Sequence, residues 1–103
     1  ATCVRLPVLG GHGESLNIEL KKDFDIEEVK QVLAAFPDII VTGDREKYPT
    51  LTDCSGRSEV FVGRIRRDDS RPRTLNMWIT ADNIRKGAAT NAVQILQLLI
   101  GKR

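Results

Sequence analysis

The spacing of apolar residues changes several times along this chain of 103 residues, and this limits the folds that it can adopt. Three stretches alternate apolar and other residues, as half-buried strands do, and one stretch carries apolar residues at helical spacing. With one short apolar run added, we predict strands over 2–8, 15–20, 39–41, 59–67 and 75–80 and helices over 25–36 and 83–100. This order indicates an α+β fold with a mainly antiparallel or mixed sheet and flanking helices.

The ends of these elements carry their own signals. Asp25 precedes Glu28 by three positions, the spacing of a capping box, and Pro37 ends the first helix. Asp82 or Asn83 can cap the second helix. We expect an irregular loop over 42–58, and a turn over 10–13 that joins the first two strands into an antiparallel hairpin.

Composition excludes several classes of protein. The chain is long enough for one small domain, and 41% apolar residues indicate a globular protein. Sixteen basic and fourteen acidic residues leave a net charge of +2, too balanced to indicate nucleic-acid binding. No apolar run approaches the ~20 residues that span a membrane, and no signal peptide opens the chain. We therefore expect a cytoplasmic protein.

The two cysteines, Cys3 and Cys54, are too few for a disulfide framework or for a metal site with one histidine. In a cytosolic protein we expect two reduced thiols, with a disulfide between them as the alternative. Neither cysteine has the basic surroundings or helix start that would make a reactive thiolate, so we expect no nucleophile. The chain also begins inside a predicted strand at Ala1, which indicates a piece of a longer protein.

The one histidine is the first candidate for chemistry. His12 lies among Gly10, Gly11 and Gly13, where an imidazole is unobstructed and can move a proton near neutral pH. Arg5 lies seven positions earlier and can grip a carboxylate, and Glu14 can orient the ring. The alternative is that all of these are ordinary surface residues.

A second candidate is the run Gly87-Ala88-Ala89 in the predicted last helix. Small residues there permit either close packing of the helix on a sheet or contact with a flat ligand. In the second case, Asn83 can present an amide that both donates to and accepts from a carboxamide. Spacing alone leaves the two alternatives even.

Three segments together resemble the aspartate-semialdehyde dehydrogenase family. Cys3-Val4-Arg5, followed after six residues by His12, resembles the second half of that family's catalytic domain. Residues 58–66 are similar to one of its strands, and residues 81–94 (ADNIRKGAATNAVQ) are similar to its C-terminal helix. The resemblance covers almost the whole chain and is weakest over 42–52.

The resemblance implies the C-terminal catalytic domain of the glyceraldehyde-3-phosphate-dehydrogenase-like fold. Residues 1–80 would be the last part of the catalytic and dimerisation domain. Residues 81–103 would be a C-terminal helix that packs on an N-terminal NADP-binding domain outside this chain. A homodimer or homotetramer is implied.

The implied activity is the NADP-dependent, reversible reductive dephosphorylation of aspartyl phosphate to aspartate semialdehyde, with release of phosphate. The pathway is the biosynthesis of lysine (through diaminopimelate), threonine and methionine. His12 would be the general acid and base, and Arg5 would bind the substrate α-carboxylate. Asn83 would contact the nicotinamide carboxamide, and Gly87 would let the cofactor approach.

The family's nucleophilic cysteine follows an asparagine, and neither cysteine here does. Its glycine-rich nucleotide-binding fingerprint is also missing, so we expect the chain to be inactive by itself. Two alternatives are an acyl-phosphate reductase of the N-acetyl-γ-glutamyl-phosphate reductase type and a non-catalytic α+β interaction module.

Overall fold

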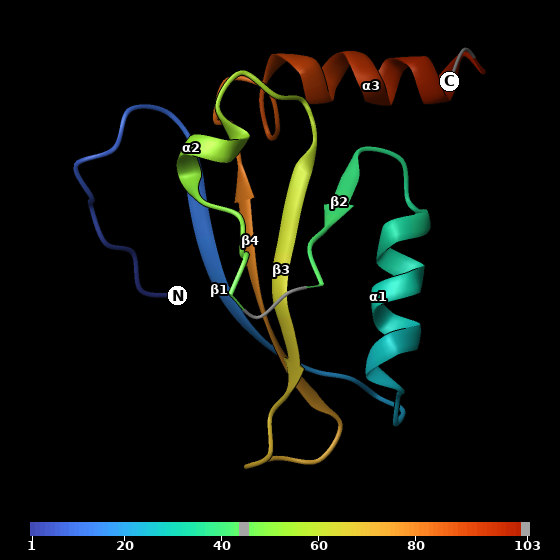
Figure 1. Ribbon diagram of the computed structural model, residues 1–103. Helices are drawn as coiled ribbons and strands as arrows, with labels where there is room; N and C mark the ends of the chain where they lie inside the picture. Colours follow the sequence, from blue (N-terminus) through green and yellow to red (C-terminus); the bar gives the residue numbers. More distant parts are fainter. Residues whose placement is uncertain (44–45, 102–103) are drawn as a thin grey trace.

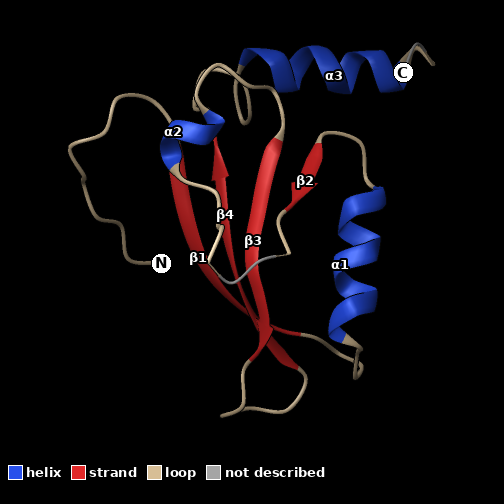
Figure 2. Ribbon diagram, in the orientation of Figure 1, coloured by secondary structure: helices blue, strands red, loops and turns tan. Residues whose placement is uncertain are grey.

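A four-stranded sheet organises the molecule in the computed structural model, which describes residues 1–43 and 46–101 (Figure 1). The elements in chain order are β1 (His12–Glu19), α1 (Ile26–Ala35), β2 (Ile39–Val41), α2 (Leu51–Cys54), β3 (Val60–Arg67), β4 (Thr74–Ala81) and α3 (Ala89–Leu99). The strand order is β1-β4-β3-β2. β4 is antiparallel to both of its neighbours, and β2 is parallel to β3. The predicted α+β fold with a mixed sheet and flanking helices is confirmed (Figure 2).

The core lies between the sheet and α1. Val62, Ile65, Leu75 and Met77 are buried there, and apolar residues of α1 such as Val29 and Leu33 pack against them. Asp25 caps α1, because its carboxylate accepts hydrogen bonds from the backbone N–H groups of Glu27 and Glu28. The first predicted helix and its cap are therefore confirmed.

The Trp78 ring and a loop lie on the opposite face of the sheet. Trp78 lies over Gly13 of the neighbouring strand, and its indole N–H donates to the carbonyl of Pro49 at 2.8 Å. Pro49 is buried and packs against Gly63. This contact places the chain before α2 across β3 and β4.

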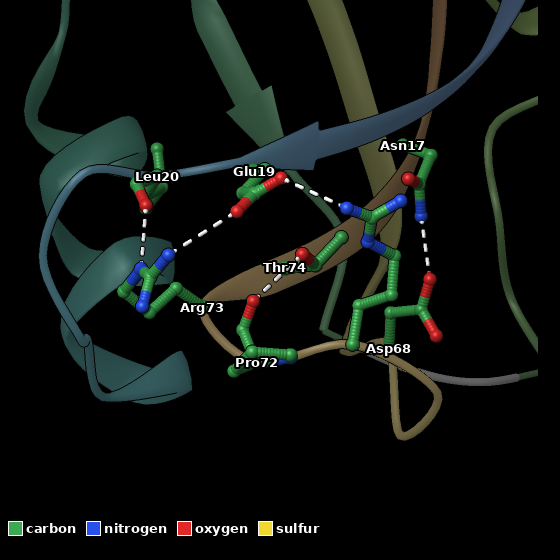
Figure 3. Close-up of polar contacts among 8 residues, drawn as sticks. Asn17, Glu19, Leu20, Asp68, Pro72, Arg73 and Thr74 are labelled. Atoms are coloured by element: carbon green, nitrogen blue, oxygen red, sulfur yellow. Dashed lines mark hydrogen bonds and ion pairs between the residues drawn. The ribbon is translucent and has the colours of Figure 1, made fainter.

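Polar contacts fix the end of the sheet that holds the β3–β4 turn (Figure 3). Arg73 donates to the Leu20 carbonyl and pairs with Glu19, which also pairs with Arg71. Asn17 donates to the carboxylate of Asp68 at 2.8 Å. These contacts join the last residues of β1 to the β3–β4 turn. Polar contacts therefore hold this end of the sheet, and His12 lies at the other end.

The predicted strand over 2–8 is wrong, and so is the hairpin that it would form. Residues 1–11 form no strand, and β1 pairs instead with β4, with His12 opposite Ala81. A strand needs a hydrogen-bonding neighbour, and the structure gives none to this segment. Its alternating side chains lie in solvent, and Val4 is 76% exposed.

The predicted helix over 83–100 begins later than expected, at Ala89. Asp82 starts a separate helical turn: its carboxylate accepts from the Ile84 N–H, and its carbonyl accepts from the N–H groups of Arg85 and Lys86. Gly87 then adopts φ +73°, a left-handed conformation that interrupts a right-handed helix. The sequence pattern predicted one continuous helix here, whereas Gly87 separates a turn from α3.

The predicted loop over 42–58 contains the short helix α2, and its residues 44–45 lie outside the described residues. Asp53 stabilises the start of α2 by accepting hydrogen bonds from the N–H and hydroxyl of Thr50. These bonds lower the pKa of the Asp53 carboxyl. A capping pair thus forms one helical turn in a segment without helical periodicity.

Helix α3 lies across one end of the sheet and extends beyond it (Figure 1). Its apolar side chains are at least half exposed: Val93, Ile95, Leu96, Leu98 and Leu99. Polar contacts attach it, since Gln94 accepts from Lys86 at 2.6 Å and donates to Asp38 at 2.9 Å. Within the described residues, no helix is long and apolar enough to cross a membrane.

Candidate active site

His12 opens β1 at the end of the sheet that also carries α2 and the 82–87 turn (Figure 1). Its partner across the sheet is Ala81, the last residue of β4. Because Asn83 follows Ala81 by two residues, the strand pairing brings it beside the imidazole. The side chain of His12 is 40% exposed, so the ring is accessible to a substrate.

The Asn83 amide bridges the ring to the backbone. Its Oδ1 lies 2.5 Å from Nδ1 of His12, and its Nδ2 donates to the carbonyl of Gly11 at 3.1 Å. An amide oxygen only accepts, so Nδ1 of the ring is the donor in the first bond. The bond to Gly11 orients the amide, and the amide orients the candidate catalytic ring.

Glu14 lies on the same face of β1 as His12, because side chains two residues apart on a strand point to the same side. Its Oε1 is 3.9 Å from Nε2 of His12. This distance is too long for a hydrogen bond but allows attraction when the ring is protonated. Both groups are solvated, so the attraction is worth at most about 1 kcal/mol.

Asp82 fixes the turn that carries Asn83. The Asp82 side chain is buried, and its carboxylate accepts hydrogen bonds from the backbone N–H groups of Gly56 and Ile84, at 2.7 and 2.8 Å. These two bonds hold the pKa of the Asp82 carboxyl below its usual value. They link the loop after α2 to the start of the turn.

Behind the site lies Cys54, whose thiol is fully buried and donates to the carbonyl of Leu51. Burial raises the pKa of this thiol, which makes it a poor nucleophile. Gly11 approaches it so closely that a Cβ at position 11 would lie 3.4 Å from its sulfur. Cys3 is an exposed free thiol on the N-terminal segment.

Arg5 and Gly87 do not join this network. Arg5 is exposed on the 1–11 segment and makes no hydrogen bond or ion pair with any residue that the structure describes. Gly87 faces open space, since a Cβ there would meet nothing within 4 Å. Of the four predicted site residues, the structure brings together His12 and Asn83.

Comparison with known proteins places this arrangement in a family. Residues 1–86 match the family model described as semialdehyde dehydrogenase, dimerisation domain. The chain belongs to this family. The resemblance found in the sequence is thereby confirmed, and the family's dimerisation domain is the part that the chain represents.

Aspartate-semialdehyde dehydrogenases are among the relatives of this dimerisation domain. The enzyme of Aquifex aeolicus is 52% identical over 102 residues, which are 97% of this chain and 30% of the relative. That of Legionella pneumophila is 50% identical over 101 residues, 95% of this chain and 29% of the relative. The chain thus spans about a third of the length of the relatives it matches.

A solved structure agrees with these relatives. Aspartate semialdehyde dehydrogenase II of Vibrio cholerae, crystallised in complex with ASA, superposes with a TM-score of 0.89 at 44% identity. The superposition covers 96% of this chain and 30% of that one. The α+β fold of the dimerisation domain is therefore shared with an enzyme of this kind.

The sequence did not predict that Asn83 touches His12, or that Asp82 fixes the turn beside it. The signal lay in the pairing of β1 with β4, since a correct register would have put residue 83 beside residue 12. The expected hairpin concealed this pairing by giving β1 a different neighbour.

Proposed function

We propose that this dimerisation domain is part of an aspartate-semialdehyde dehydrogenase and supplies its general acid and base, His12. The reaction is the NADP-dependent, reversible reductive dephosphorylation of aspartyl phosphate to aspartate semialdehyde, a step in the biosynthesis of lysine (through diaminopimelate), threonine and methionine. The bond from His12 to Asn83 carries the proposal, because it orients an accessible imidazole whose other nitrogen is free to exchange a proton. A cytoplasmic location accords with this pathway.

In this proposal the proton moves between Nε2 of His12 and an oxygen of the substrate. As semialdehyde is released, the substrate O–H bond breaks and the N–H bond forms, while the electron pair remains on oxygen and becomes part of the aldehyde C=O. The carbon–sulfur bond breaks in the same step, and its electron pair leaves with the thiolate. We assign this thiolate to a cysteine outside this chain, since Cys54 is buried with a raised pKa and neither Cys3 nor Cys54 follows an asparagine. In the opposite direction, His12 returns the proton.

Arg5 would hold the substrate α-carboxylate by paired hydrogen bonds. Its exposure, and the lack of another partner for it among the described residues, leave the guanidinium available. The 1–11 segment must then place Arg5 within reach of the substrate beside His12. We expect contacts with the remainder of the enzyme to set that position.

NADP, when bound, would supply or accept the hydride. Asn83 fits a carboxamide ligand, because Oδ1 retains a second lone pair and Nδ2 a second hydrogen after their bonds to His12 and Gly11. Gly87 fits the same ligand, since the space around it is open. These two residues would hold the nicotinamide end beside His12.

The proposal includes a domain arrangement. We assign residues 1–80 to the catalytic and dimerisation domain of a homodimer or homotetramer. Residues 81–103, of which 102–103 lie outside the described part, would pack on the NADP-binding domain of the same enzyme. The exposed apolar residues of α3 support this assignment, because a helix with such a surface needs a partner.

A chimaera tests the proposal. This chain would replace the matching segment of the Aquifex aeolicus enzyme, and NADPH formation from aspartate semialdehyde and phosphate would be followed. We expect activity, a loss of about 10²–10⁴-fold in kcat for His12→Ala, and little change for the surface control Lys22→Ala. A folded chimaera that keeps full activity with His12→Ala would refute the role of His12.

A second variant separates binding from proton transfer. Arg5→Ala removes a binding group, so KM for aspartate semialdehyde should rise more than kcat falls. An unchanged KM would show that Arg5 does not hold the substrate.

A further inference from the structure

The two ends of the Asn83 amide are chemically distinct, and a backbone group decides which end faces His12. The Gly11 carbonyl only accepts hydrogen bonds, so the amide nitrogen must face it. A flipped amide would place two oxygen atoms against each other. The carbonyl of Gly11 therefore sets Oδ1 toward the ring of His12.

The orientation of the amide then decides where the ring carries its proton. Oδ1 accepts, so Nδ1 of His12 must bear hydrogen, and in a neutral ring the lone pair is left on Nε2. A free histidine side chain prefers the opposite tautomer, with hydrogen on Nε2. The folded chain thus selects the less common form.

The surrounding backbone makes this selection a property of the fold. Asn83 stands two residues beyond the β4 residue that pairs with His12, and Asp82 locks its turn to Gly56. Gly11 directly precedes His12, and a side chain at position 11 would be strained at φ +79°. The β1–β4 pairing therefore holds Gly11, His12 and Asn83 in register.

We propose that Asn83 is a positioning residue, which holds His12 in the Nδ1–H tautomer so that Nε2 is the proton-exchanging atom. The effect on catalysis rests on the proposed function, whereas the tautomer itself does not. As a base, Nε2 takes the substrate proton, and the resulting imidazolium donates to Asn83 through Nδ1. Glu14, 3.9 Å from Nε2, then faces a positive charge.

Nitrogen NMR tests the tautomer directly, because His12 is the only histidine among the 103 residues. The ¹⁵N-labelled chain would be studied at alkaline pH, where imidazole is neutral, and the chemical shifts of Nδ1 and Nε2 would show which atom carries hydrogen. We expect hydrogen on Nδ1 for most molecules. Hydrogen mainly on Nε2 would overturn the proposal.

Three variants separate positioning from a general effect on the fold. Asn83→Ala removes the acceptor and should invert the tautomer ratio toward Nε2–H. Asn83→Asp keeps an acceptor of similar size and should retain Nδ1–H. Asn91→Ala, an amide deletion on α3, should change nothing. A dispersed amide spectrum checks the fold of each variant, and an unaltered tautomer in folded Asn83→Ala would refute the assignment.

The chimaera separates this inference from the proposed function. There, Asn83→Ala should lower kcat about 10–100-fold, and Asn83→Asp should recover part of the loss, in parallel with the tautomer. A tautomer that inverts without any loss of kcat would support the positioning role of Asn83 and refute the proton-transfer role of His12. A loss of kcat without tautomer inversion would refute positioning.

Discussion

Gly13 shows at the scale of single residues how one contact can decide a position. A Cβ there would lie 2.3 Å from the Trp78 ring, well inside contact distance. The ring is held in place because its N–H bonds the Pro49 carbonyl on the far side. Glycine is required here by close approach, beside the histidine of the candidate site.

We expect Gly13→Ala to lower the free energy of unfolding by about 1–3 kcal/mol, because the new methyl group must displace the indole. Urea denaturation measures the change. Gly43→Ala is the matched control, since a Cβ at position 43 meets nothing within 4 Å. Equal stability of the two variants would show that Trp78 moves aside at no cost.

Asp82 makes stability depend on pH. Backbone N–H groups of Gly56 and Ile84 lower the folded-state pKa of its carboxyl from 3.8, so the unfolded state binds a proton more readily. The stabilisation is present above pH 3.8 and is lost as the pH falls through the lower folded-state value. Asp82→Asn should therefore destabilise the chain at neutral pH and have less effect in strong acid. Urea midpoints that fall equally at both pH values would contradict this.

Among the elements, α1 is specified by its own sequence. Asp25→Ala removes the side chain that caps two backbone N–H groups and should cost about 1 kcal/mol, whereas Asp25→Ser should cost less. Asp69→Ala in the β3–β4 turn serves as the control and should stay within about 0.5 kcal/mol. Thermal or urea unfolding measures all three. A cost for Asp25→Ser as large as for Asp25→Ala would show that capping is not the cause.

The same contrast explains which elements could be predicted. Strands β2, β3 and β4 and helix α1 carry their signal within a few residues, as apolar spacing, a cap or a proline. The alternation over 2–8 is equally regular, yet a strand also needs a neighbour, and β1 pairs with β4 instead. The start of α3 depends on the backbone conformation of Gly87, and apolar spacing carries no information on it.

At the scale of the whole molecule, the candidate site combines residues that are 71 positions apart. Residue types predicted His12 and Asn83 separately, one for proton transfer and one for an amide ligand. Their hydrogen bond required the register of β1 with β4, which is a long-range property. The family resemblance implied the proposed roles of these residues, and the structure shows the hydrogen bond between them.

Helix α3 offers the last prediction, because its stability must come from few sources. An isolated helix of 11 residues is marginal in water, and most apolar side chains of α3 are exposed. In this chain alone, we expect α3 amides to exchange hydrogen much faster than those of β4, which lies between two strands.

Gln94→Ala should speed this exchange further by breaking the contacts to Lys86 and Asp38, whereas Gln97→Ala should not. In the chimaera, the proposed packing of α3 on the NADP-binding domain should protect the α3 amides. Protection of α3 equal to that of β4 in the chain alone would show that the polar contacts suffice.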